Sequence, residues 1–261
     1  MTLIPFERQQ VDFSPVNALI CARASQLVYS DNPAVAAMNG GFESLEQLER
    51  GSNNAIVLGN RENILIAFRG TDQWSDWFTN LNILYKRSPL GFVHRGFMIA
   101  ATSFWPELLH RVLEMRNNNQ SVWFAGHSLG GALAVLAAVK ARCENDLPVA
   151  GVYTFGQPPI GTASFCGEFE KRRPFRLFRV INFTDAVSSA PIITLLDHVG
   201  EVRYFDIKGK MWTGEPPWRV RLSDRVQAPR LHGGLADFKA HLMESYVELI
   251  AATGRLSTPV L

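Results

Sequence analysis

The feature that constrains this chain most is a Gly-x-Ser-x-Gly motif between two segments of different character. The motif is Gly126-His127-Ser128-Leu129-Gly130, which follows an apolar run and precedes a stretch of small residues typical of a tightly packed helix. A serine placed in this way between a strand and a helix is the signature of a nucleophile elbow. Because the two glycines have no Cβ, strand and helix can approach closely while the serine backbone holds a strained turn. The sequence therefore predicts that Ser128 is a nucleophile.

Length and composition favour one globular α/β domain over residues 1–261. Hydrophobic residues make up 47% of the chain and charged residues 19%, which suits a sizeable core and not a disordered chain. The formal net charge of +2 is too small to indicate a nucleic-acid partner. The sequence contains no apolar run approaching the roughly 18 residues of a membrane span. Any membrane contact is therefore expected to be peripheral.

Cysteine usage and the opening residues narrow the expectations further. Cys21, Cys143 and Cys166 are few, odd in number and without Cys-x-x-Cys spacing. We expect ordinary buried or half-buried side chains, not a metal or redox site. The first residues lack the pattern of a secretory signal. That favours a protein that stays inside the cell or leaves it without a recognisable N-terminal signal.

Alternating β-rich and helical segments predict a mostly parallel sheet with helices on both faces. The β-rich runs 55–59 and 63–68 are separated by a turn and predict a hairpin. Residues 207–234, rich in Pro, Gly, Trp and Arg, are expected to be irregular. The remaining expected elements are helices over 16–29, 97–115, 131–142 and 235–252, and strands over 121–125, 149–155, 177–183 and 201–206, the last of these closing the sheet.

A serine nucleophile needs a carboxylate and a histidine, and one common arrangement places them after the serine in that order. Asp185 follows directly on a predicted strand, where a loop at the carboxyl edge of the sheet would aim it toward the elbow. Asp197, Asp206 and Asp224 are better explained as turn or cap residues. Asp185 is therefore the predicted acid, which orients an imidazole and stabilises its charged form.

Among the histidines that follow Asp185, His241 is the predicted base. It comes after every predicted strand, near the start of the last helical segment. His198 directly precedes the final predicted strand and is expected to pack near the sheet. His232, expected in a glycine-rich loop, remains the alternative base. His127, inside the elbow, is expected to be structural.

The developing oxyanion needs two backbone N–H donors. One is expected from Leu129, directly after the nucleophile, and the other from Thr71, in the loop that leaves the strand ending at Phe68. The alternative is that Thr71 is a simple turn residue.

A stripe of bulky apolar residues follows Thr71 at the spacing of one helical face. Such a stripe fits a packed core, and beside an oxyanion loop it also fits a lid that turns toward a lipid surface. We expect the lid. The residues are Trp74, Trp77, Phe78 and Leu81.

Two groups of basic residues leave two interpretations open. Each could hold an anionic lipid surface by its charge, or each could be ordinary solvated surface. The first group is Lys171-Arg172-Arg173 with Arg176 and Arg179, and the second is Arg219, Arg221, Arg225 and Arg230.

Several motifs, taken in order, resemble the class 3 lipases, the fungal-type triacylglycerol lipases within the α/β-hydrolases. The resemblance implies an α/β-hydrolase fold with a short helical lid. It also implies a Ser128-Asp185-His241 triad, an oxyanion hole of Thr71 and Leu129, and a lid over 74–81. Secreted fungal members carry a signal and several disulfides, so the resemblance favours a bacterial or intracellular setting here. The motifs are Ile66-Ala67-Phe68-Arg69-Gly70-Thr71, Val93-His94-Arg95-Gly96-Phe97, residues 126–134, Tyr153-Thr154-Phe155-Gly156-Gln157-Pro158, Asn182-Phe183-Thr184-Asp185 and His198-Val199-Gly200.

The expected activity is hydrolysis of carboxylic esters through an acyl-enzyme on Ser128. The expected substrates are acylglycerols at an oil–water interface. This chemistry requires no metal and no organic cofactor. A phospholipase A1 or a soluble-substrate esterase would use the same triad with a different pocket and lid. A different class of protein, a catalytically silent α/β-hydrolase used as a binding module, typically loses a triad member or an elbow glycine, and none is missing here.

Overall fold

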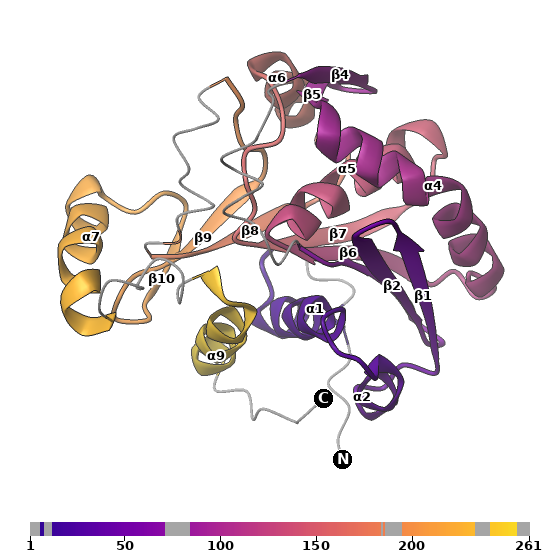
Figure 1. Cartoon of the computed structure of the whole chain (residues 1–261), viewed down its shortest axis with the longest axis horizontal. Helices are drawn as coiled ribbons and strands as arrows, with labels where there is room; N and C mark the ends of the chain where they lie inside the picture. Colours follow the sequence, from indigo (N-terminus) through magenta and orange to yellow (C-terminus); the bar gives the residue numbers. More distant parts are fainter. Residues whose placement is uncertain are drawn as a thin grey trace.

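An eight-stranded sheet runs through the described part of the chain, in the order β1-β2-β3-β6-β7-β8-β9-β10 (Figure 1). The computed structural model describes residues 6–7, 12–70, 84–183, 185, 195–232 and 241–254. The neighbours from β3 to β9 pair in parallel, and the strands at both edges pair antiparallel. The strands are β1 (Ser44–Arg50), β2 (Asn53–Gly59), β3 (Asn63–Phe68), β6 (Ser121–His127), β7 (Val149–Phe155), β8 (Leu177–Asn182), β9 (Glu201–Phe205) and β10 (Met211–Thr213).

Helices cover both faces of this sheet, as the sequence predicts (Figure 1). On one face lie α1 (Pro15–Leu27), α2 (Pro33–Asn39) and α9 (Met243–Gly254). On the other lie α4 (Arg95–Met115), α5 (Leu129–Glu144) and α6 (Ala163–Arg172). A small separate hairpin, β4 (Tyr85–Ser88) with β5 (Gly91–His94), lies beside α6.

The near-continuous apolar runs of the central strands explain the two-sided core. Every residue of β3 is buried. Ile64 and Ile66 pack with α4 and α5, whereas the alternate residues Leu65 and Ala67 pack with α1 and α9. Because successive side chains of a strand point to opposite faces, a strand covered on both sides must be apolar throughout.

Most predicted elements are confirmed within a few residues, and three expectations need correction. The strand β10 follows β9, so the run 201–206 is not the last strand. Residues 207–232 are not irregular, because they contain β10 and the helix α7 (Trp218–His232). The final helix α9 begins at Met243, and residues 235–240 lie outside the described part of the chain.

A polar sequence explains why the edge strand β1 was not predicted. The edge strand β1 reads Ser-Leu-Glu-Gln-Leu-Glu-Arg and buries only Leu48. An edge strand with a solvated side carries little of the β-branched, apolar signal by which strands are predicted.

Neither a disulfide nor a membrane-spanning helix is found in the described part of the chain. Cys21 is buried and Cys166 half-buried, but Cys143 is exposed, contrary to expectation, and all three are free thiols. No helix in the described ranges is long and apolar enough to cross a bilayer.

Two glycines allow β3, β6 and α5 to meet at the elbow. A Cβ on Gly126 would lie 2.1 Å from the carbonyl oxygen of Gly130. A Cβ on Gly130 would lie 2.1 Å from the carbonyl oxygen of Phe68, at the end of β3. These neighbours are backbone atoms of α5 and of the end of β3, so they cannot move aside as a flexible side chain would.

Substitution of Gly126 or Gly130 by alanine is expected to destabilise the protein by at least about 1–3 kcal/mol, the usual range for overpacking. Gly167→Ala is the matched control, because a Cβ there would meet nothing within 4 Å and the residue lies inside α6. This control is expected to be neutral or to stabilise by about 0.5–1 kcal/mol. Urea unfolding of the three variants measures the difference, and equal stability of Gly126→Ala and Gly167→Ala would contradict the packing argument.

Candidate active site

Ser128 lies between the end of β6 and the start of α5, in a backbone conformation that non-glycine residues rarely adopt. Its φ is 55° and its ψ is −128°. Its N–H donates to the carbonyl oxygen of Phe155 in β7, at 2.9 Å. Such strain persists only where the surroundings hold it, and here the close packing of Gly126 and Gly130 does so. The predicted elbow is therefore present, and its serine is only 2% exposed.

The predicted acid and base are in contact. Asp185 follows β8 and is fully buried, and its Oδ2 lies 2.9 Å from Nδ1 of His241. Because an ionised carboxylate can only accept hydrogen bonds, Nδ1 of His241 is the donor. The hydroxyl of Tyr246, in α9, donates to the same oxygen at 2.5 Å and accepts from the N–H of Asn182 at 3.3 Å. The carboxylate thus fixes the orientation of the His241 ring through Nδ1.

The surroundings of Asp185 favour its charged form. Burial alone raises the pKa of this carboxyl, but the charge and hydrogen bond of His241 and the hydroxyl of Tyr246 outweigh it, so the pKa is lowered. Burial and the neighbouring charge of Asp185 together raise the pKa of Tyr246 well above its usual value. Tyr246 therefore remains a hydrogen-bond donor, and Asp185 remains an anion.

The carboxyl end of β7 brings the serine and the acid–base pair together. Ser128 bonds to Phe155, and the next residue, Gly156, has a φ of 58°. A Cβ on Gly156 would lie 2.5 Å from Oδ2 of Asp185 and 2.9 Å from Nδ1 of His241. Any side chain here would displace the pair, and the positive φ also favours glycine. Gly156 is therefore part of the site, although the sequence analysis used it only as part of a motif.

His127, expected to be structural, connects three parts of the site. Its Nε2 lies 2.6 Å from the carbonyl oxygen of His241, and its Nδ1 lies 3.1 Å from the hydroxyl of Tyr29. That hydroxyl also accepts from the N–H of Gly70, at 2.9 Å. The chain of bonds thus joins the end of β3, the elbow and the backbone of the proposed base.

The partners of His127 determine its tautomer. A carbonyl oxygen can only accept, so Nε2 of His127 carries the proton and Nδ1 accepts from Tyr29. Burial, reinforced by the nearby His241, lowers the pKa of His127 to about 3. The ring is therefore neutral at ordinary pH, and each hydrogen bond in the chain has a defined direction.

One predicted oxyanion donor lies among the described residues. Leu129 is the first residue of α5, so its N–H has no acceptor within the helix and belongs to the positive end of the helix dipole. Gly70, which precedes Thr71, packs against the elbow, since a Cβ on it would lie 3.0 Å from Cβ of Ser128.

Several predicted site residues lie outside the described part of the chain. Thr71 and the lid residues belong to the range 71–83, of which the structure describes nothing. His232 was expected in a loop but is the last residue of α7. Its side chain is not described. The lid residues concerned are Trp74, Trp77, Phe78 and Leu81.

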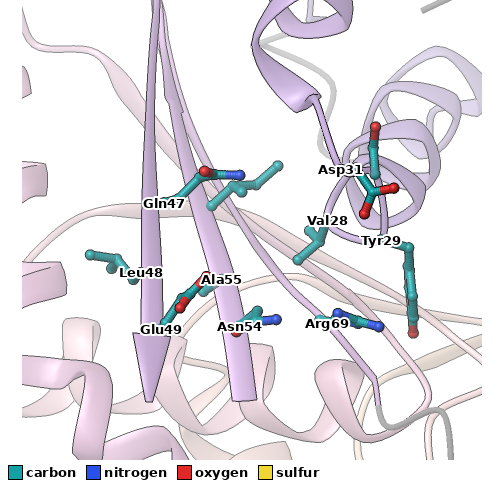
Figure 2. Close-up of a pocket in the computed structure, with 11 residues that line it drawn as sticks. Val28, Tyr29, Asp31, Gln47, Leu48, Glu49, Asn54, Ala55 and Arg69 are labelled. Atoms are coloured by element: carbon teal, nitrogen blue, oxygen red, sulfur yellow. The ribbon is translucent and has the colours of Figure 1, made fainter. Parts of the chain in front are cut away.

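A polar cavity of about 250 Å³ opens behind this site, between the end of α1 and the strands β1 and β2 (Figure 2). Tyr29 and Arg69 lie on one side of it, with the guanidinium of Arg69 5.1 Å from the centre of the Tyr29 ring. Neither Ser128, Asp185 nor His241 lines it. It is therefore not the space in which a substrate would meet the serine.

The neutral His127 predicts a loss of stability in mild acid. The unfolded chain binds a proton at this histidine below its ordinary pKa of 6.5, whereas the folded chain does so only near pH 3. The free energy of unfolding should therefore fall as the pH decreases from 6.5 toward 3. Urea unfolding between pH 7.5 and 4.5, above the ordinary pKa of 3.8 for Asp185, should give a shallower decline for His127→Gln than for the wild type. Equal slopes would contradict the buried, neutral assignment.

Comparison with known proteins finds similarity to a lipase family and to proteins named as lipases and phospholipases. The family model described as Lipase (class 3) matches residues 65–195, half of the chain. The chain is 29% identical over 157 residues to the chloroplastic phospholipase A(1) DAD1 of Arabidopsis thaliana, covering 52% of this chain and 35% of that protein. It is 26% identical over 206 residues to the secreted mono- and diacylglycerol lipase 1 of Fusarium solani, covering 76% and 60%. The chain thus spans less than two thirds of the length of these relatives.

Solved structures agree on the fold. A triacylglycerol lipase described as having a serine protease triad as its catalytic centre matches with a TM-score of 0.64 and 24% identity, covering 76% of this chain and 83% of that one. A Rhizomucor miehei lipase–propeptide complex matches with a TM-score of 0.60 and 23% identity, covering 75% and 69%. The parallel sheet, the serine elbow and the family match lead to one conclusion: the chain belongs to the class 3 lipase family and has the α/β-hydrolase fold.

Proposed function

We propose that this chain hydrolyses carboxylic esters of lipids through an acyl-enzyme on Ser128. The observation that carries the proposal is the buried Asp185–His241 pair, joined by a 2.9 Å hydrogen bond beside the strained backbone of Ser128. A serine hydroxyl is a weak nucleophile until a positioned base takes its proton. Asp185, held as an anion, stabilises the imidazolium that forms when His241 does so.

The proposed reaction has two balanced halves. Oγ of Ser128 attacks the ester carbonyl carbon while His241 takes the hydroxyl proton, which forms a tetrahedral oxyanion. Collapse of this intermediate breaks the ester C–O bond, and His241 gives its proton to the departing alcohol. Water then attacks the acyl-enzyme with His241 as base, which releases the fatty acid and restores Ser128.

The oxyanion is proposed to bind two backbone N–H groups. The N–H of Leu129 is supported by its place at the first position of α5. The N–H of Thr71 is supported by the packing of its neighbour Gly70 against Ser128. Removal of one such donor typically lowers kcat by about 10²–10³-fold, so these groups supply a large share of the rate.

Acylglycerols are the proposed substrates, and phospholipids are the second candidate. The relatives include proteins named mono- and diacylglycerol lipase, triacylglycerol lipase and phospholipase A1. One structural relative is titled as a model for interfacial activation in a fungal lipase. The 2% exposure of Ser128 is consistent with a site that opens at a lipid surface, and residues 74–81 are proposed as its lid.

Substitution of the triad separates this proposal from its alternatives. Ser128→Ala and His241→Ala are expected to lower kcat on p-nitrophenyl butyrate by on the order of 10⁴–10⁶-fold, since triad members act as a unit. His232→Ala is the matched histidine control and should stay within a few-fold of wild type, with all variants showing cooperative thermal unfolding. Loss of activity only in His232→Ala would reassign the base. A wild type that turns over no ester would favour the silent binding module.

The same preparation can distinguish lipase from esterase and phospholipase. Rates are measured on p-nitrophenyl esters from C2 to C16, on emulsified triglyceride and on phosphatidylcholine, below and above the concentration at which each substrate aggregates. A lipase is expected to gain rate when the interface forms. Saturation on monomeric substrate with no such gain would instead identify a soluble-substrate esterase.

A further inference from the structure

The helix α7 turns three apolar side chains outward. Trp218, Leu222 and Val226 are 68%, 53% and 51% exposed, and their spacing of four places them in one line along the helix. We call these three residues the α7 stripe. They line a shallow depression of about 350 Å³ on the helix surface. In Figure 1 this helix stands out beyond β10, away from the helices that cover the sheet.

Polar contacts hold the opposite side of α7 against the protein. Asp224 is only 2% exposed, and its carboxylate accepts a hydrogen bond from the hydroxyl of Tyr204 at 2.8 Å. Its other oxygen accepts from the N–H of Ile207 at 3.2 Å. A surface helix ordinarily buries its apolar face and exposes its polar face. Here the arrangement is reversed, so the α7 stripe is not needed to attach the helix.

Arginines border the α7 stripe on both sides. Arg219, Arg221 and Arg225 are all exposed, against a single exposed carboxylate on Glu215, which pairs with Arg221 at 3.2 Å. On a helix with 100° per residue, Arg219 falls on one side of the stripe, and Arg221 and Arg225 fall on the other. The guanidinium of Arg219 also lies 5.5 Å from the centre of the Trp218 ring.

The other basic group of the sequence lacks this character. Arg179 is buried within β8 at 6% exposure, so it is not part of a surface. Lys171 and Arg172 both pair with Glu168. This group therefore offers fewer free charges and serves as a natural control.

We propose that α7 docks on an anionic lipid surface. The α7 stripe would enter the boundary between headgroups and acyl chains, where tryptophan is favoured, and the three arginines would contact lipid phosphates. Charge complementarity selects this occupant, since a neutral apolar partner would supply no counter-charge to Arg219 or Arg225, and Arg221 has only Glu215. The residues that follow α7 lead within nine positions to His241, so the docking surface and the proposed base belong to one short stretch of chain.

This binding needs no hydrolysis and so stands apart from the proposed function. Three apolar side chains and three arginines give a reversible attachment, because each arginine contributes only about a fivefold gain in partition to an anionic membrane. Both elements should therefore be required, and salt should weaken the attachment because it screens the charges.

Vesicle co-sedimentation tests the proposal. The Ser128→Ala protein, which leaves the lipid intact, is mixed with vesicles of phosphatidylcholine alone or with 30% phosphatidylglycerol, at 100 and 500 mM NaCl. The compared variants are Trp218→Ala with Leu222→Ser, and Arg219→Gln with Arg221→Gln and Arg225→Gln. The matched charge control is Lys171→Gln with Arg172→Gln and Arg173→Gln. Hydrolysis of a monomeric ester, measured with Ser128 intact, and the thermal midpoint verify that each variant is folded.

The expected result is at least tenfold tighter binding to the anionic vesicles, lost at 500 mM NaCl. Both sets of α7 variants should lose at least tenfold in affinity, the charge control should keep wild-type affinity, and Trp218 fluorescence should shift to the blue on binding. Equal binding to both vesicle types, or equal loss in the charge control, would overturn the proposal. So would failure of vesicle binding together with a dimer in light scattering that Trp218→Ala abolishes, since a second copy would then cover the stripe.

Discussion

The rest of the site depends on the hydrogen bonds that a charged carboxylate, buried after the end of β8, accepts from its neighbours. An isolated ion in this position would be strongly unfavourable, so the fold must supply compensating donors. Asp185 finds them in His241, which precedes α9, and in Tyr246, which lies within that helix. The docking of α9 against the sheet is therefore coupled to the ionisation of the acid. The same contacts that make burial tolerable also orient the imidazole, which is why one arrangement serves both stability and chemistry.

Three glycines and one neutral histidine position the Asp185–His241 pair beside the serine. Gly126 and Gly130 let β6 and α5 close on β3, and Gly156 gives Asp185 and His241 room at the end of β7. The ring of His127 accepts a hydrogen bond from the hydroxyl of Tyr29 and donates one to the backbone carbonyl of His241. The hydroxyl of Tyr29 in turn accepts from the N–H of Gly70. The site thus lies at the carboxyl ends of the four adjacent strands β3, β6, β7 and β8, the place where open α/β sheets usually hold their ligands.

The sequence predicted the parts of this arrangement that leave a local signal. The elbow, the apolar strands and the order of Asp185 and His241 could be predicted because each depends on neighbouring residues or on chain order. Tyr246, Tyr29 and the role of Gly156 could not, since their contacts join residues that lie 29 to 98 positions apart in the chain. The helix α7 was missed for a different reason: its apolar residues face outward and its buried Asp224 faces inward, the reverse of the pattern by which surface helices are predicted.

We propose that His241, held by Asp185, activates Ser128. Covalent labelling with a fluorophosphonate tests it most directly, because the probe reports the attacking atom without dependence on the natural substrate. We expect a single adduct on Ser128 by mass spectrometry, with a labelling rate that falls on the order of 10³-fold or more in His241→Ala. An adduct on another residue, or an unchanged rate in that variant, would contradict it.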